Sequence, residues 1–253
     1  MSQRDARPAT STRLADRNAE GGRSDLFDAS AKLYTATFPY VWRYGFRSLH
    51  PWLASRFAGC RSILDAGTGP GYWASYLASV ERRERVVGLD FSPEFIRLAR
   101  ARTRSGNVEF VCADLTRAPF ADASFDGILC SGVLDTFPDP APAFFEFRRL
   151  LRPGGRVVLI LRGPGTRGSK LLERFFRFCV GATAAIRRRS MRPLFVPEAQ
   201  WSRKAIWCDL PDLAAASGLE LSECDARGLI TKAVLVALES AEDGGRREPE
   251  AAG

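Results

Sequence analysis

The sequence predicts an α/β fold in which a mostly parallel sheet carries helices on both faces. Three observations lead to this prediction. Short apolar segments that suit buried strands alternate with helical segments, the connections between them are short, and several strand segments end in an acidic residue. Regular alternation of strand and helix favours a parallel sheet, because two parallel strands need a crossover between them that is usually a helix.

The pattern allows each element to be placed in order. Seven strands are expected, at residues 62–65, 85–90, 108–112, 125–130, 156–161, 219–223 and 232–239. Helices are expected at 72–79, 93–102, 142–151 and 210–217. Pro93 falls in a first helical turn, where a missing N–H costs nothing. Pro153-Gly154-Gly155 is expected to end the helix at 142–151, and Gly218 the helix at 210–217.

The chain length of 253 residues and its 45% apolar content suit one domain with a full core. We expect this domain at 26–240, between polar tails at 1–25 and 241–253. Within it, aromatic helical residues 26–60 would form an N-terminal lid, 61–161 the core, 162–200 an inserted basic and aromatic cap, and 201–240 the end of the sheet. A polar N-terminus and the absence of a bilayer-length apolar run favour the cytoplasm.

Histidine and cysteine usage excludes several classes of site. The chain has a single histidine and six cysteines, and none of the cysteines form a C-x-x-C pair. The usual zinc sites therefore lack ligands, and histidine-based nucleophilic catalysis has one candidate base. No metal is expected.

The run Asp65-Ala66-Gly67-Thr68-Gly69-Pro70-Gly71 follows the first strand. Its glycines let the backbone approach a ligand and turn sharply into the next helix. Residues 69–74 also fit G-x-G-x-x-A, a fingerprint of nicotinamide dinucleotide sites. Two acidic residues argue against a nicotinamide dinucleotide as the ligand of this loop. Asp65 would repel a pyrophosphate but suits a cationic amino acid, and Asp114 after the third strand could accept a hydrogen bond from adenine.

Four runs in this order resemble the class I S-adenosylmethionine-dependent methyltransferases, in the branch that includes ubiquinone and menaquinone biosynthesis enzymes. They are ILDAGTGPG at 63–71, VVGLDFSPEFIRLAR at 86–100, FVCADLTRAPFADASFDGILC at 110–130 and LLRPGGRVVLI at 150–160. The resemblance covers about residues 62–161, with a typical tail module over about 201–239. It implies a Rossmann-like methyltransferase fold with a mostly parallel seven-stranded sheet.

The resemblance also implies which residues hold S-adenosyl-L-methionine and its product S-adenosyl-L-homocysteine. The implied contacts are Asp65, Gly67 and Gly69 at the amino-acid end, Ser131 under the methionine, Asp90 on both ribose hydroxyls, Phe91 on the adenine ring, and Asp114 with the Leu115 N–H at the adenine amino group. Gly71, in the same loop, is also an implied cofactor-binding residue. A carboxylate suits the ribose diol because it has two acceptor oxygens.

One departure from the family pattern bears on the acceptor. Relatives in this branch often carry a histidine after the fourth strand, where this chain has Asp135 or Thr136. Asp135 is therefore the candidate base, and Tyr34, Phe137 and Arg162 are candidate substrate contacts. The expected reaction is in-line transfer of a methyl group to a small, lipophilic or aromatic molecule. Whether oxygen, carbon or nitrogen is methylated stays open.

The basic charge of the chain is local. Residues 162–192 carry nine basic residues and one acid, a surplus equal to the net charge of +8 of the whole chain. Three interpretations stay open: a solvated basic face, a substrate cap, or contact with a membrane surface or lipid, since leucines and phenylalanines are interleaved with arginines.

Three further functions compete with the methylation of a small molecule. The basic segment could serve an RNA methyltransferase, but no RNA-binding module is recognised and nucleic acid is not the expected partner. A non-catalytic binding protein could keep the same fold. A nicotinamide-dependent oxidoreductase would explain the glycine loop by itself.

Overall fold

The computed structural model describes residues 46, 49–81, 83–162, 209–225 and 230–237, with Arg162 and 230–237 described by their backbone. Predictions for the two tails, for Tyr34 and most of the lid, for the cap after Arg162 and for the Arg162 side chain lie outside the described residues.

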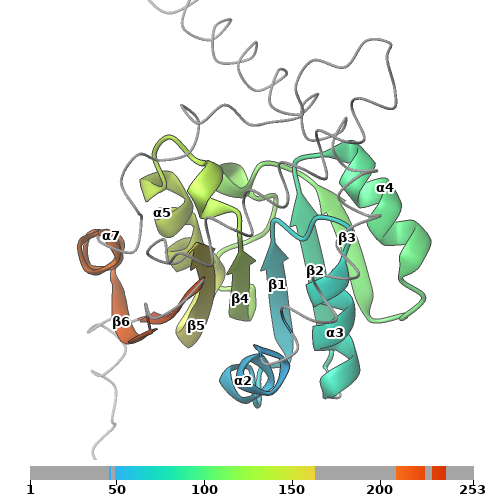
Figure 1. Ribbon diagram of the computed structural model, residues 1–253, viewed down its shortest axis with the longest axis horizontal. Coiled ribbons are helices and arrows are strands. Elements are labelled where there is room, and N and C mark those ends of the chain that lie inside the picture. The colour runs from blue at the N-terminus through green and yellow to red at the C-terminus, as the bar shows by residue number, and fades with distance from the viewer. Residues whose placement is uncertain (1–45, 47–48, 82, 163–208, 226–229, 238–253) are drawn as a thin grey trace, which may run out of the picture.

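The sheet contains seven strands in the order β3-β2-β1-β4-β5-β7-β6 (Figure 1). Neighbouring strands from β3 to β5 are parallel, whereas β7 runs antiparallel to both β5 and β6. The predicted mostly parallel sheet is confirmed. The strands are β1 (Ser62–Ala66), β2 (Arg85–Asp90), β3 (Val108–Cys112), β4 (Phe125–Ser131), β5 (Leu151–Arg162), β6 (Leu219–Asp225) and β7 (Ile230–Ala237).

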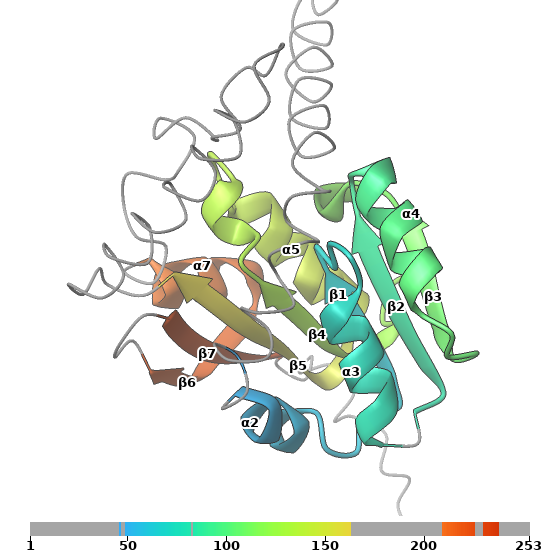
Figure 2. The same cartoon turned by 45° about the vertical axis from the view of Figure 1, so that its right-hand side comes forward.

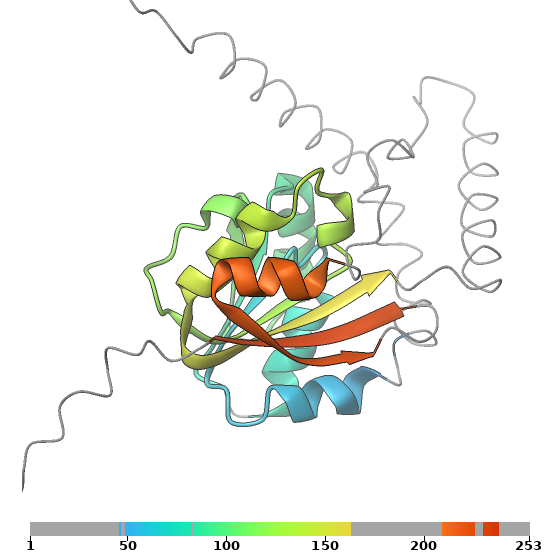
Figure 3. The same cartoon turned by 90° about the vertical axis from the view of Figure 1, so that its left-hand side faces the viewer.

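Helices cover both faces of the sheet, as predicted (Figure 3). One face carries α2, α3 and α4, and the other carries α5 and α7. The described helices are α2 (Leu49–Arg56), α3 (Tyr72–Val80), α4 (Pro93–Arg102), α5 (Ala141–Leu150) and α7 (Leu210–Ser217), with single 3-10 turns at η2 (Leu115–Arg117) and η3 (Leu134–Thr136).

The core consists of two apolar layers, one on each face of the sheet. In β1, Leu64 packs on the α5 side and Ile63 on the α3 side, and both are fully buried. Neighbouring residues of a strand point to opposite faces, so a strand covered on both sides must be apolar throughout. This is why β1 reads as a continuous buried segment.

Two helix boundaries follow from specific residues. Ser92 is the N-cap of α4, and its side chain accepts a 3.1 Å hydrogen bond from the N–H of Phe95. Pro93 follows in the first turn, as predicted. At the other end of the fold, Gly218 closes α7 with a φ of 75°, a left-handed conformation that favours glycine.

The start of β5 differs from the prediction. We expected the helix to run to Leu151 and the strand to begin at Arg156, but α5 ends at Leu150 and β5 begins directly at Leu151. Leu151 pairs with Phe125, and the next pair is Arg156 with Gly127, so residues 152–155 form a bulge in the strand. Pro153 disfavours the helical conformation at the residue before it, which moves the boundary upstream.

Helix α2 is the one helix of the predicted lid among the described residues, and it packs in the core layer. Leu53 and Phe57 are fully buried, and Phe57 packs so closely on Gly127 that an added Cβ there would lie 2.7 Å from the ring. Trp52 Nε1 donates to Glu223 on β6 at 3.3 Å, and Arg56 forms an ion pair with Glu223 at 2.7 Å. These contacts fix α2 to the last antiparallel pair of strands.

Candidate functional site

A cavity of about 220 Å³ lies at the carboxyl ends of β1, β2 and β4. This is the edge where open parallel sheets bind their ligands. Figure 2 shows α3 in front of β1 and α4 in front of β2 and β3. The lining residues are Phe46, Gly67, Thr68, Gly69, Pro70, Tyr72, Trp73, Asp90, Phe91, Phe95, Ser131, Gly132, Val133 and Thr136.

The glycine loop between β1 and α3 forms the floor of this cavity. The N–H groups of Gly67 and Thr68 both donate to Leu89 O, at 2.7 and 2.9 Å, which fastens the loop to the end of β2. Gly67 and Gly69 have φ values of 78° and 53°. A Cβ at Gly69 would meet no atom within 4 Å, so the backbone there borders open space. The loop thus offers main-chain atoms to a ligand.

Asp65 lies beneath the loop and holds it together. Only 1% of the residue is exposed, and its Oδ2 accepts hydrogen bonds from Thr68 Oγ1 at 2.6 Å and from the N–H of Ala74 at 3.0 Å. Burial raises the pKa of Asp65 to about 7; the hydrogen bonds from Thr68 and Ala74 oppose this shift, and the charge of Asp90 adds to it. Asp65 therefore joins the loop to the first turn of α3.

Asp90 ends β2 and lines the cavity. Its Oδ2 accepts a 2.9 Å hydrogen bond from the N–H of Gly69, and its Oδ1 accepts one of 3.0 Å from the N–H of Ser92. A carboxylate has about four acceptor sites, so the same group can hold both loops and accept hydroxyl groups. This carboxylate and the open glycine backbone fit the ribose and the amino-acid part of S-adenosylmethionine.

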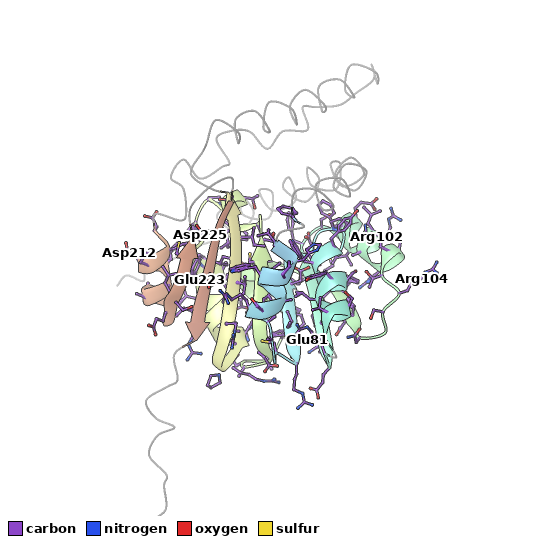
Figure 4. All side chains as sticks on the ribbon, turned by 60° about the horizontal axis from the view of Figure 1, so that its bottom comes forward. Glu81, Arg102, Arg104, Asp212, Glu223 and Asp225 are labelled. Atoms are coloured by element: carbon purple, nitrogen blue, oxygen red, sulfur yellow. The ribbon has the colours of Figure 1, made fainter. Side chains whose placement is uncertain are left out.

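Aromatic side chains form the walls of the cavity. Phe46 and Trp73 lie with ring centroids 5.8 Å apart, and Phe91 and Phe95 come from the segment after β2. The Arg102 guanidinium lies 3.5 Å from the centre of the Tyr72 ring, and Figure 4 shows Arg102 and Glu223 at opposite lateral edges of the fold. Walls of this kind suit a flat apolar ligand with few polar groups.

The structure brings five of the predicted cofactor residues together at the cavity. They are Gly67, Gly69, Asp90, Phe91 and Ser131. Their contacts with a ligand stay predictions.

Two further predicted residues shape the loop from outside the cavity. Asp65 lies below the loop, as described above. Gly71, with a φ of 78°, precedes α3, where an added Cβ would lie 2.9 Å from the Phe110 ring.

Four other predicted residues also do not line the cavity. Asp114 is the N-cap of η2 and accepts hydrogen bonds from Thr116 N at 2.8 Å and Thr116 Oγ1 at 3.0 Å. The neighbouring Leu115 is buried in the core. Asp135, in η3, is only 7% exposed, and Phe137 packs against the core on the α5 face.

Part of the wall was not predicted from the sequence. Tyr72 and Trp73 directly follow the glycine loop, and Phe95 lies in the first turn of α4, so their position after two loops predicted to bind the cofactor was an available signal. Val133 and Thr136 flank the buried Asp135. In the sequence they look like ordinary loop residues.

The described part of the chain holds neither a metal site nor a membrane span. Over these residues, no group of three or more His, Cys, Asp or Glu side chains is arranged to hold a metal ion. Within the same ranges, no helix has the length and apolar character needed to cross a membrane.

Several known proteins with similar sequences are named methyltransferases. The family described as "Methyltransferase domain" matches residues 64–159. The demethylmenaquinone methyltransferase of Lactococcus lactis subsp. lactis is 32% identical over 190 residues, which cover 73% of this chain and 69% of that protein. The enzyme of the same name from Deinococcus radiodurans is 36% identical over 110 residues, 43% of this chain and less than half (46%) of the relative.

A solved structure supports the same fold. The SAM-dependent methyltransferase from Aquifex aeolicus superposes with a TM-score of 0.55 at 15% identity, covering 75% of this chain and 89% of that chain. At this identity the likeness concerns the fold alone.

Proposed function

Because this chain belongs to the class I S-adenosylmethionine-dependent methyltransferases, in the branch that includes quinone biosynthesis enzymes, we propose that it methylates a small lipophilic or aromatic acceptor. The observation that carries the proposal is the cavity itself, where a strand-end carboxylate and an open glycine loop lie beside aromatic walls. The names of the two demethylmenaquinone methyltransferases support a quinone-like ring as the acceptor.

S-adenosylmethionine, when bound, supplies a methyl group on a sulfonium, which is already a strong electrophile. The chain's own residues must then bind, orient and exclude water. Asp90 and the backbone of Gly69 would hold the ribose and amino-acid ends, and Asp65 keeps the loop in place from below. Correct orientation of two reactants can lower a barrier by roughly 7–11 kcal/mol, so a strong base is not required.

The acceptor would lie against the aromatic walls and Thr136. Thr136 Oγ1 donates to Val133 O at 2.7 Å, which orients the hydroxyl at the cavity surface. Asp135 stays the candidate base for an acidic acceptor such as a phenol, one residue from this lining position. Phe137 and Arg162 stay candidate substrate contacts.

The test is a transfer assay with S-adenosylmethionine that carries a deuterated methyl group. The purified full chain is incubated with a demethylated quinol, and the product is identified by mass spectrometry. We expect a labelled methylated quinol together with S-adenosylhomocysteine, and loss of both in Asp90→Ala. The control is Glu94→Gln, because Glu94 forms an ion pair with Arg97 on the surface of α4 and does not line the cavity.

Two results would contradict the proposal. Binding of S-adenosylhomocysteine without transfer to the quinol or to any molecule of a lipid extract would favour a non-catalytic binding protein. Transfer to RNA, with an affinity that falls steeply as salt is raised, would favour an RNA methyltransferase.

A further inference from the structure

A second cavity, of about 250 Å³, lies at the opposite edge of the sheet, where β1, β4 and β5 begin. It is lined by residues 58–60 before β1, by Asp126 at the start of β4, and by residues 152–156 in the bulge of β5. No lining residue is shared with the cavity at the carboxyl edge. The proposed methyl transfer leaves this second cavity without a role.

Glycines form part of its wall. Gly59 and Gly154 have φ values of 77° and 71°, and an ideal Cβ at either position would meet no atom within 4 Å. Both glycines are exposed. The backbone at these two positions is therefore open on the side where a side chain would lie.

The arginines at this edge have carboxylate partners, with one exception among the described residues. The pairs are Arg56–Glu223 at 2.7 Å, Arg61–Glu84, Arg83–Glu81 at 3.4 Å and Arg152–Asp126 at 2.6 Å. Arg156 lines the cavity and is half-buried, and no carboxylate of the described residues lies within 4.0 Å of its guanidinium. Among the described residues, the Arg156 guanidinium donates one hydrogen bond, from Nη1 to the backbone carbonyl of Arg56 at 3.2 Å.

The carboxylate in the wall does not cancel this charge. Asp126 already accepts the N–H groups of Arg61 and Ser62, both at 2.8 Å, and the guanidinium of Arg152. Burial raises the pKa of Asp126, but these hydrogen bonds and the charge of Arg152 outweigh it, so the net pKa lies below its ordinary value. The excess positive charge of the cavity is therefore that of Arg156.

We propose that this cavity binds a phosphate group, with Arg156 as its main ligand. A guanidinium has five donors in a planar fork, and one hydrogen bond to a carbonyl leaves donors that match two phosphate oxygens. Gly59 and Gly154 lie on the same wall, and the absence of side chains there leaves room for the phosphate beside the backbone. Partial burial strengthens the interaction relative to an exposed arginine.

Calorimetric titration of the full chain with inorganic phosphate tests this proposal. The buffer contains no other multivalent anion, and the chain is saturated with S-adenosylhomocysteine to occupy the carboxyl-edge cavity. We expect one saturable site in the wild type. Arg156→Gln should weaken it by at least about tenfold, as loss of a charged hydrogen-bond donor does. Arg156→Lys should weaken it less, because the charge stays while the fork is lost.

Arg61→Gln is the matched control. Arg61 lies at the same edge, its side chain is 70% exposed, and it does not line the cavity. We expect its phosphate affinity to equal that of the wild type. A parallel titration with glycerol phosphate separates two sources of the group: binding of both ligands assigns the site to phosphate esters, and binding of phosphate alone assigns it to the free ion.

Three results would overturn the proposal. They are no saturable binding by the wild type, equal affinity in Arg156→Gln and the wild type, and equal losses in Arg156→Gln and Arg61→Gln. Each variant is first checked for folding by its thermal transition and its affinity for S-adenosylhomocysteine. If Arg156→Gln does not fold, the comparison of Arg156→Lys with Arg61→Gln decides in the same way.

Discussion

The N–H of Gly69 donates a 2.9 Å hydrogen bond to Oδ2 of Asp90. This bond joins the loop after β1 to the end of β2, 21 residues away in the chain. The carboxylate proposed to hold the ribose therefore also fixes the loop proposed to hold the amino-acid end of the cofactor. A change at Asp90 should affect both ends of the cofactor, and the loss of affinity should exceed that of one hydrogen bond.

Gly67→Ala should destabilise the fold more than Gly132→Ala. Both glycines have a positive φ, of 78° and 67°, so both substitutions carry a backbone cost of about 1–2 kcal/mol. At Gly67 the added methyl would also overlap Val133 Cγ2, whereas at Gly132 it would meet no atom within 4 Å. Overpacking adds about 1–3 kcal/mol. Urea unfolding measures the difference, and equal midpoints would contradict the packing described here.

Asp65 should make folding stability depend on pH. Burial raises its pKa from 3.8 to about 7 in the folded protein. Between pH 4 and pH 7 the folded state keeps a proton that the unfolded state releases, so this residue's contribution to stability is present at low pH and is lost as the pH rises through 7. Asp65→Asn removes the titrating group and keeps an acceptor oxygen for Thr68 and Ala74.

The measurement is the free energy of unfolding in urea at about pH 5 and about pH 8, on either side of the raised pKa of Asp65. The wild type should be more stable relative to Asp65→Asn at the lower pH than at the higher, by roughly 2.7 kcal/mol, because about two pH units separate pH 5 from the raised pKa and each contributes about 1.36 kcal/mol. If the free energy of unfolding changes with pH in the same way in both proteins, the pKa of Asp65 is not raised and the prediction is contradicted.

Glu223→Ala should loosen α2 from the sheet. Glu223 accepts a hydrogen bond from Trp52 Nε1 and forms an ion pair with Arg56. About a third of each charged side chain is exposed, 35% for Arg56 and 36% for Glu223. We expect a loss of about 1 kcal/mol, since partly exposed ion pairs contribute little. A double-mutant cycle with Arg56→Ala isolates the pair. The control is Glu220→Ala, because Glu220 is an exposed acid on the same strand. An equal loss of stability in Glu220→Ala would contradict a specific role of Glu223 in holding α2.

Arg149→Met should be the most damaging surface substitution of α5. Its guanidinium bonds both carboxylate oxygens of Glu146 at 2.6 and 2.9 Å, Asp122 at 2.7 Å, and two backbone carbonyls in residues 118–120. Glu146 is only 8% exposed, so its charge would lose its partner inside the fold. Breaking a fully buried pair costs about 3–5 kcal/mol, but a third of the Arg149 side chain is exposed (33%), so we expect a smaller loss of about 2 kcal/mol.

Thermal unfolding of Arg149→Met measures that loss. Arg97→Met is the control, because the pair of Arg97 with Glu94 is exposed and should contribute less than about 1 kcal/mol. Similar melting temperatures for the two variants would contradict a stabilising role of the Arg149 contacts with Glu146 and Asp122.

The sheet was predictable because its signal is local. Buried parallel strands are short apolar runs, and the acid that ends β2 together with the glycines after β1 mark the ligand edge. The cavity wall was less predictable, since Phe46, Val133 and Thr136 meet there from segments far apart in the chain. Periodicity within one segment carries no information on such neighbours.

Two local patterns had competing interpretations in the sequence. Asp114 follows a strand, as an adenine-binding acid would, and the same position also suits an Asx turn; its Oδ1 caps η2, and its contact with adenine stays a prediction. The run Pro153-Gly154-Gly155 suits a helix stop, but in the structure it lies inside the bulge of β5. The sequence around each residue is compatible with both outcomes.

The central claim is that this chain binds S-adenosylmethionine through the glycine loop and Asp90. A calorimetric titration with S-adenosylhomocysteine and, separately, with NAD tests it most directly. We predict binding of S-adenosylhomocysteine in the micromolar range (Kd on the order of 1–100 μM), its loss in Asp90→Ala, and no comparable binding of NAD. Tight binding of NAD, with S-adenosylhomocysteine binding absent or unchanged in Asp90→Ala, would contradict the account.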